Sequence, residues 1–125
     1  MKNLKFRVWH KEERKMLYEE IIGESFVWLH KEKQPIEIMQ STGLKDKNNV
    51  EIFENDILEV DYQGQKFFSN YVGQVEYSKG CFWCIKHNGY GGDRYTLSGL
   101  TDDTRTYRST LKIIGNIYEN PELLK

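Results

Sequence analysis

Two short runs of residues, joined by a tight connection, carry the clearest folding signal in the chain. Every second position from Tyr71 to Tyr77 is Tyr, Gly or Val, and these side chains share one face of a predicted strand. Ser78-Lys79-Gly80 is a short connection, and the run from Cys81 to Lys86 returns as the partner strand. This hairpin predicts a mainly β protein with antiparallel strands.

Strand patterns also occupy the first forty residues. Leu4–Trp9 has the period-2 alternation of a half-buried strand. Residues 11–22 fit either a helix or the return strand of a hairpin, and we favour the hairpin. A further strand is expected over Ser25–Glu32, and Pro35 forces an extended connection into residues 36–40.

Turn signals separate the strands that follow. Residues 41–50 concentrate Gly, Asp and Asn, which predicts an exposed turn in which Asn48-Asn49 supplies positive φ. A turn at Glu54-Asn55 then leads into a strand over residues 56–62, and another turn is expected at residues 63–65.

The last third of the chain has fewer strand signals. Residues 88–108 hold four glycines and six charged residues among scattered apolar positions, so regular structure should be sparse there. Leu111–Tyr118 is expected to be the final strand. Asn120-Pro121 then predicts one helical turn, with Asn as the cap and Pro in the first helical position.

Composition and charge narrow the class of protein. Hydrophobic residues make up 38% of the chain and aromatic residues 14%, enough large apolar surface to fold a core. A net charge of −1 gives the molecule no long-range attraction to nucleic acid or to anionic membranes. No apolar stretch resembles a signal peptide or approaches the roughly 20 residues that span a bilayer. We therefore expect a cytoplasmic protein with no membrane partner.

No motif predicts a metal site, a cofactor or catalysis. Cys81 and Cys84 lack a second ligand pair, and their spacing on a strand points them to opposite faces, so we interpret both as small core residues. The three histidines are dispersed and have no recognisable catalytic partner. An acidic cluster is interpreted as a solvated strand face in preference to a cation site; it comprises Glu51, Glu54, Asp56, Glu59 and Asp61.

One loop keeps a binding role open. Between residues 90 and 108 it interleaves aromatic and basic side chains, namely Tyr90, Arg94, Tyr95, Arg105, Tyr107 and Arg108. Such residues stack on bases and bind phosphates, and the same types are enriched at protein interfaces. An ordinary surface loop is the alternative. Of the binding roles, the slightly negative net charge favours a protein partner over single-stranded nucleic acid.

Four blocks of sequence span nearly the whole chain, namely KFRVW, QSTGLKDKNNVEIFENDIL, VEYSKGCFWCI and IIGNIYENPELL. Together they resemble the YopX-like family of phage and prophage proteins. Family members typically carry Gly where this chain has Asn49 and Asn55, and Asp where it has His10. Asn is the next best residue at positive φ, so the two turns should be retained.

The resemblance implies a fold and no activity. It implies an all-β protein with strongly coiled sheets, divided into an N-terminal β-hairpin region over residues 1–48 and a domain similar to an SH3-type small barrel over residues 49–125. We therefore predict a non-enzymatic protein-binding or assembly module acting on a host or phage protein. The alternative is a single-stranded nucleic-acid binder that uses the small barrel and the Tyr/Arg loop.

Self-association is a further expectation. Several short coiled β-elements leave unpaired strand edges, which a second subunit would cover, and the resemblance points the same way. The candidate contacts are the aromatic and apolar residues near the start of the chain, namely Phe6, Val8, Trp9, Phe26 and Trp28. Their alternative role is a small second core within one subunit.

Overall fold

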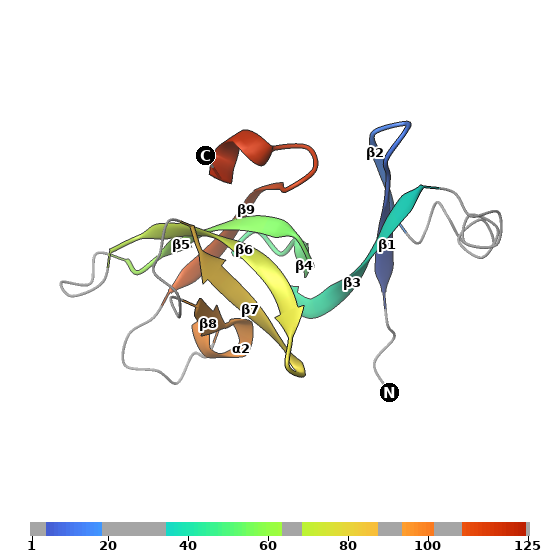
Figure 1. The fold of residues 1–125 in the computed structure, drawn as a ribbon. Coiled ribbons are helices and arrows are strands. Elements are labelled where there is room, and N and C mark those ends of the chain that lie inside the picture. The colour runs from blue at the N-terminus through green and yellow to red at the C-terminus, as the bar shows by residue number, and fades with distance from the viewer. Residues whose placement is uncertain (1–4, 19–34, 64–68, 88–93, 102–108, 125) are drawn as a thin grey trace.

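The computed structural model describes residues 5–18, 35–63, 69–87, 94–101 and 109–124. Its strands form two antiparallel sheets, which confirms the all-β class. The four-stranded sheet has the order β2-β1-β3-β4 and the five-stranded sheet the order β8-β7-β6-β5-β9 (Figure 1). The strands are β1 (Phe6–His10), β2 (Lys15–Tyr18), β3 (Ile36–Lys45), β4 (Glu51–Phe53), β5 (Asp56–Asp61), β6 (Tyr71–Ser78), β7 (Cys81–Lys86), β8 (Arg94–Thr96) and β9 (Thr110–Asn116).

The five-stranded sheet surrounds the main apolar core. Its inward side chains meet those of β4 and of a short helix, α2 (Leu97–Leu100), which lies against β7 and β8 (Figure 1). The buried members of this core include Ile52, Leu58, Val60, Val75, Cys84, Leu97, Leu100 and Leu111. Burial of this apolar surface is the main source of stability in this half of the molecule.

The β6–β7 hairpin is confirmed. Ser78 pairs with Cys81, so the connecting loop is the two residues Lys79 and Gly80, with φ of 51° and 82°. Positive φ at both positions is typical of the tight turns that suit the twist of a hairpin. Gly80 adopts it without a side-chain penalty.

The hairpin favoured for residues 11–22 is confirmed over the described part of that segment. β1 pairs with β2, and Val8 lies opposite Leu17. The turn between them is held by the His10 imidazole, whose Nδ1 accepts a hydrogen bond from the Glu13 N–H at 3.2 Å. A carboxylate can accept the same bond, so this turn is compatible with the Asp that the resemblance would place at position 10.

The exposed turn predicted for residues 41–50 is wrong in its first half, because β3 continues to Lys45. Gly43, with a φ of 79°, lies where the β3–β4 register shifts between Ser41 and Lys45. The Thr42 hydroxyl donates to the Ile52 carbonyl at 2.7 Å and so maintains the pairing through the irregularity. Gly and hydroxyl residues therefore mark a β-bulge here, although the same residues also mark turns.

The remaining half of that segment is a turn, and it locks onto β9. The Asp46 carboxylate accepts the N–H groups of Asn48 and Val50 at 2.9 Å each, and that of Ile113 at 3.0 Å. Burial acts to raise the pKa of Asp46, but these three donors outweigh it and hold the pKa below its usual value. Asn49 has a φ of 66°, which confirms the predicted positive φ.

Regular structure in residues 88–108 is less sparse than predicted. β8 pairs with β7, and α2 follows at once, capped by the Thr96 hydroxyl, which accepts the Gly99 N–H at 3.2 Å. Only two residues of α2 are buried, Leu97 and Leu100, so the segment lacks the apolar periodicity of a longer helix.

The C-terminal strand ends earlier than predicted, at Asn116. The Asn116 side-chain oxygen accepts the N–H groups of Tyr118 and Glu119, at 3.0 and 2.9 Å, and turns the chain out of the sheet. The helical turn after it is a 3-10 helix, η1 (Pro121–Leu124). The side chain of Asn120 does not cap this helix as predicted, because its oxygen accepts the Asn116 N–H at 3.2 Å.

The proposed domain boundary at residue 48 lies inside the turn between β3 and β4, two strands that pair with each other. Both this boundary and the SH3-type barrel remain predictions.

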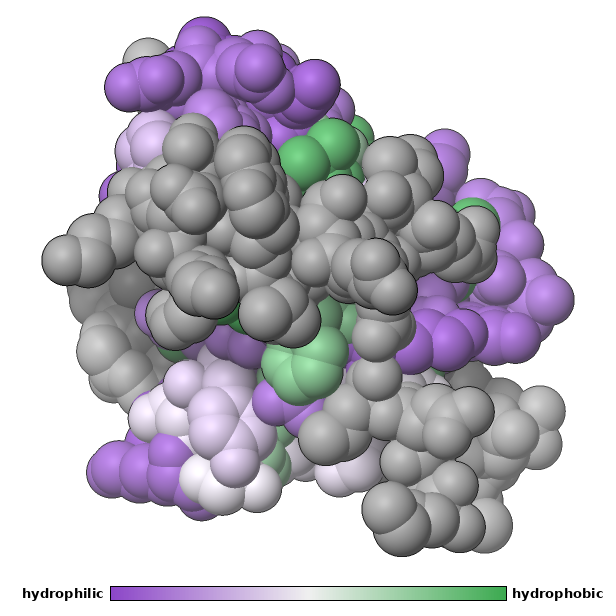
Figure 2. All heavy atoms as spheres, turned by 90° about the vertical axis from the view of Figure 1, so that its right-hand side faces the viewer, coloured by the Kyte–Doolittle hydropathy of each residue, from purple (hydrophilic) through white to green (hydrophobic). Residues whose placement is uncertain are grey.

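Over the coloured part of Figure 2, hydrophobic residues appear as small separate areas among hydrophilic ones. Within the described ranges, no helix is long and apolar enough to cross a membrane.

Candidate functional site

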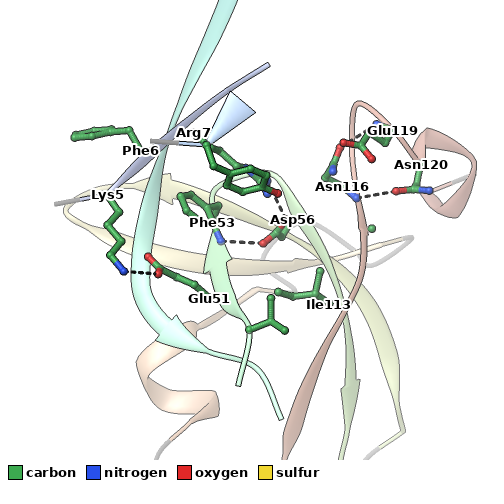
Figure 3. Close-up of a pocket in the computed structure, with 13 residues that line it drawn as sticks. Lys5, Phe6, Arg7, Glu51, Phe53, Asp56, Ile113, Asn116, Glu119 and Asn120 are labelled. Atoms are coloured by element: carbon green, nitrogen blue, oxygen red, sulfur yellow. Dashed lines mark hydrogen bonds and ion pairs between the residues drawn. The ribbon is translucent and has the colours of Figure 1, made fainter. Parts of the chain in front are cut away.

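A pocket of about 740 Å³ lies where the two sheets meet. Strands β1, β2 and β4 of the first sheet form one side, and β5, β9 and the turn before η1 form the other (Figure 3). Its lining residues are Lys5, Phe6, Arg7, Tyr18, Val50, Glu51, Phe53, Asp56, Ile113, Gly115, Asn116, Glu119 and Asn120.

The centre of this pocket is a buried ion pair between the sheets. The Arg7 Nη2 atom lies 2.9 Å from Asp56 Oδ1, and both side chains are only 3% exposed. The same nitrogen donates to the Glu54 carbonyl at 3.0 Å, while Asp56 Oδ2 accepts the Phe53 N–H at 2.8 Å. The pair therefore fixes β1 against the turn between β4 and β5.

Burial and charge act in opposite directions on this pair. Burial raises the pKa of Asp56, and the neighbouring Arg7 guanidinium and the Phe53 N–H partly offset the rise. The Arg7 guanidinium also lies 4.9 Å from the centre of the Phe53 ring, a cation–π distance. The Nε atom of Arg7 is buried and has no hydrogen-bond acceptor among the described residues.

The remaining walls combine an ion pair, a polar turn and aromatic rings. Lys5 lies 3.3 Å from Glu51 Oε1, and the Ser41 hydroxyl bonds to Glu51 Oε2. The Tyr18 ring meets Phe53 edge-on at 5.8 Å. On the β9 side, a methyl group at Gly115 would overlap the side chain of Asn120, so glycine is required for this turn to close.

A second, aromatic contact joins the sheets beside the pocket. The rings of Trp9 and Tyr118 stack with centroids 5.3 Å apart and an interplanar angle of 14°. The Tyr118 hydroxyl accepts a hydrogen bond from Asn55 Nδ2 at 3.3 Å, and Asn55 Oδ1 accepts one from Gln74 at the same distance. Asn55 has a φ of 68°, as predicted for this turn, and links the turn to β6 and to the C-terminal segment.

Of the residues predicted for self-association, the structure describes Phe6, Val8 and Trp9. Val8 is 0% exposed and Trp9 4%, so both are already covered within the chain, Val8 by Leu17 and Ile36 and Trp9 by the Tyr118 ring. Phe6 is partly buried and lines the pocket. Phe26 and Trp28 lie outside the described residues. Self-association remains a prediction, and any surface for it must include residues other than Val8 and Trp9.

The Tyr/Arg loop is described only at Arg94 and Tyr95, both on β8; Tyr90, Arg105, Tyr107 and Arg108 lie outside the described ranges. Arg94 lies over the Trp83 ring at 4.4 Å. Tyr95, which is 40% exposed, lies 5.7 Å from the ring of Tyr71. Adjacent residues of a strand point to opposite faces, so these two side chains do not converge on one site.

The cysteines occupy the predicted opposite faces of β7. Cys84 is fully buried in the main core, where burial raises its pKa to about 12 and keeps the thiol protonated. Cys81 is only partly buried, so the expectation of a core residue holds for Cys84 alone. Among the described residues, no three His, Cys, Asp or Glu side chains are grouped so that they could hold a metal ion.

The sequence did not single out this pocket. Asp56 was assigned to a solvated acidic face, and that interpretation is wrong, because the residue is 2% exposed and paired with Arg7. The signal was present in part, since Arg7 lies in the alternating pattern of β1 and Asp56 follows a predicted turn. Their pairing joins positions 49 residues apart and leaves no trace in local spacing.

Comparison with known proteins gives a family and two similar structures. The model of the family described as YopX protein matches residues 23–125. A crystal structure of protein EF1440 from Enterococcus faecalis is 30% identical, covers 100% of both chains and superposes with a TM-score of 0.63. The structure of protein yopX from Bacillus subtilis is 21% identical, covers 97% of this chain and 98% of its own, and has a TM-score of 0.61. No curated protein matches the chain.

Proposed function

This chain belongs to the YopX family, and from that premise we propose that it is a cytoplasmic, non-enzymatic protein of phage or prophage origin that binds a host or phage protein. The observation that supports this proposal is the pocket between the two sheets. A concave, mostly apolar site with a few polar groups is the usual form of a binding site. The carboxylates of Asp56 and Glu51 are held by their own neighbours, which suits a binding wall better than a general base.

The exposed residues at the edge of the pocket suit a protein partner. Tyr18 is 41% exposed and Val50 51%, which is high for such side chains. Tyrosine is enriched in protein interfaces, where its ring is buried and its hydroxyl stays hydrogen-bonded. A partner that covers both residues removes this apolar area from water.

Substitution of these two residues tests the proposal. Proteins retained from a host lysate by the wild-type chain are identified, purified and titrated against Tyr18→Lys and Val50→Glu. We expect each change to raise the dissociation constant at least tenfold. Tyr77→Lys is the matched control, because Tyr77 is 53% exposed and does not line the pocket. Unchanged affinity in both pocket variants, or an equal loss in Tyr77→Lys, would contradict the proposal.

Single-stranded nucleic acid is the second candidate, supported by the exposed ring of Tyr95, on which a base could stack, and by the basic residue Arg94 beside it in sequence. Retention on an oligonucleotide column that falls as salt rises, and that weakens in Arg94→Ala, would favour it, because phosphate contacts release counterions. Absence of retention even at low salt would remove it.

We also propose that the protein self-associates. Ile38, on β3 of the four-stranded sheet, is 41% exposed and is a better probe than the buried Trp9. Light scattering should give a mass several times that of one chain, and Ile38→Lys should lower it while Tyr77→Lys does not. A monomer at every concentration tested would contradict this proposal.

A further inference from the structure

The carboxylate oxygens of Asp56 and Glu51, which line the pocket, already accept hydrogen bonds from other residues of the protein. Asp56 accepts Arg7 with one oxygen and the Phe53 N–H with the other. Glu51 accepts Lys5 with one oxygen and Ser41 with the other. A ligand that enters the pocket therefore finds each of these four oxygens engaged with a neighbour.

The two asparagines of the β9 side are oriented by their oxygens. Asn116 Oδ1 accepts two main-chain N–H groups, from Tyr118 and Glu119, and Asn120 Oδ1 accepts the Asn116 N–H. In an amide side chain only the oxygen can accept a hydrogen bond, so these bonds determine which terminal atom is the oxygen and which is the NH₂ nitrogen. Neither NH₂ group donates a hydrogen bond to another described residue, and neither belongs to the buried polar atoms without a partner, so both remain open to solvent. Both residues line the pocket.

Arg7 is the third lining residue that has a hydrogen-bond donor without a partner among the described residues. Both of its hydrogen bonds, to Asp56 and to the Glu54 carbonyl, come from Nη2. Its Nε atom is buried and lacks an acceptor within the described part of the chain, although the side chain is only 3% exposed. A buried donor without a partner is costly, so an acceptor supplied by a ligand to this guanidinium would be stabilising.

The charges around the pocket favour a neutral acceptor group on the ligand over an anionic one. Two positive residues, Lys5 and Arg7, face three negative ones, Glu51, Asp56 and Glu119, a sum of −1. This balance gives no net attraction to a carboxylate or a phosphate. A neutral carbonyl oxygen satisfies the same donors and meets no such repulsion.

We propose that the pocket binds a peptide segment of the partner through its main-chain carbonyls. An apolar side chain of the peptide packs against Phe53, Tyr18 and Ile113, and the flanking carbonyl oxygens accept from the amides of Asn116 and Asn120 and from the Arg7 guanidinium. This inference rests on the proposed function and specifies what its site recognises.

The first test uses three small probes that share an aromatic ring and differ in the carbonyl groups attached to it. N-acetyl-L-phenylalanine amide carries an aromatic ring and neutral carbonyls, N-acetyl-L-phenylalanine replaces the terminal amide with a carboxylate, and toluene has the ring alone. In NMR titrations of the labelled protein, the neutral amide should shift the amide resonances of Phe53, Gly115 and Asn116, with a dissociation constant of about 1 mM for a ligand of this size. The other two should bind at least fivefold more weakly.

The second test removes the donors and retains the turn. Asn116→Asp and Asn120→Asp preserve the oxygen that accepts the main-chain N–H groups and replace the NH₂ donor. Each should weaken binding of the neutral amide about tenfold without changing the rest of the spectrum. Asn70→Asp is the matched control, because Asn70 Oδ1 likewise accepts a main-chain N–H, from Tyr62 at 2.9 Å, and Asn70 does not line the pocket.

The outcomes separate this inference from the proposed function. Equal binding of toluene and of the neutral amide, or full affinity of both Asp variants for the amide, would overturn carbonyl recognition. If Tyr18→Lys still abolishes binding of the partner in that case, the proposed function stands. If Tyr18→Lys leaves the partner bound and no probe shifts the pocket resonances, both fail.

Discussion

The two sheets have the same antiparallel pairing but depend on different interactions. The five-stranded sheet surrounds a continuous core of ten buried residues, whereas the separate cluster within the four-stranded sheet has one fully buried residue, Val8, with Leu17 and Ile36 packed against it. The smaller sheet is joined to the larger by the Arg7–Asp56 ion pair and the Trp9–Tyr118 stack. The five-stranded sheet is held by apolar packing, to which β4 and the end of β3 contribute Ile52 and Leu44, whereas β1 is held against it by specific polar and aromatic partners.

Removal of one member of the ion pair should have the largest effect. Asp56→Ala leaves the Arg7 guanidinium buried without its counter-charge, and we expect it to lower the free energy of unfolding by about 3–5 kcal/mol in urea denaturation. Arg7→Met should cost a similar amount. The double variant should cost clearly less than the sum of the two, because it leaves no unpaired buried charge. Strict additivity would mean that the pair does not join the sheets.

Shortening one leucine in each sheet measures the difference between the two cores. Leu58 is 0% exposed within the main core, and Leu58→Ala should cost about 3 kcal/mol through the cavity that it leaves. Leu17 is only partly buried, and Leu17→Ala should cost about 1 kcal/mol. Thermal and urea unfolding of both variants provide the measurement. Equal losses would show that the smaller sheet depends on apolar packing as much as the larger one.

The Asp46 turn, which joins β3 to β9, should make the molecule sensitive to acid. The folded-state pKa of Asp46 lies below the ordinary value of 3.8, so its contribution is complete above that pH and is lost as the pH falls through the folded pKa. Asp46→Asn should lower the free energy of unfolding by about 2 kcal/mol at neutral pH and flatten the loss in acid. Asp61→Asn, at an exposed turn, is the control. If the free energy of unfolding of Asp46→Asn falls as steeply with decreasing pH as that of the wild type, groups other than Asp46 cause the acid sensitivity.

The smallest expected effects concern the two asparagines at positive φ. Asn49→Gly removes backbone strain at a φ of 66° and should change stability by no more than about 0.5 kcal/mol. Asn55→Gly gives the same relief but loses the hydrogen bonds to Tyr118 and Gln74, and should cost about 1 kcal/mol. If Asn55→Gly is the more stable of the two, Asn55 does not help to hold the C-terminal segment.

The local parts of this fold were predictable from the sequence. The β6–β7 hairpin, the β1–β2 hairpin and the positive φ of Asn49 follow from residue preferences over a few positions, and the positive φ of Asn55 follows from the resemblance. Gly43 was misjudged because glycine and hydroxyl residues mark bulges as well as turns. Local patterns identify an element more reliably than they identify an irregularity within one.

The candidate site was not predictable in the same way. Its central pair joins Arg7 to Asp56, and its far wall is formed by Asn116 and Asn120. Each of these residues looks like an ordinary strand or turn residue in its own segment. Only the tertiary arrangement shows how these Asn side chains are oriented, since their oxygens are held by main-chain N–H groups of the turn after β9.

The turn after β3 also protects the molecule from aggregation. β9 is the last strand of its sheet, and an exposed last strand is a template on which another chain can add. Here the Lys47 N–H occupies the Leu111 carbonyl at 2.8 Å, and the Asp46 carboxylate occupies the Ile113 N–H. An incoming strand would have to displace a nearly buried carboxylate before it could pair with this stretch of β9. Fibril-like growth by strand addition is therefore blocked along that stretch of the edge.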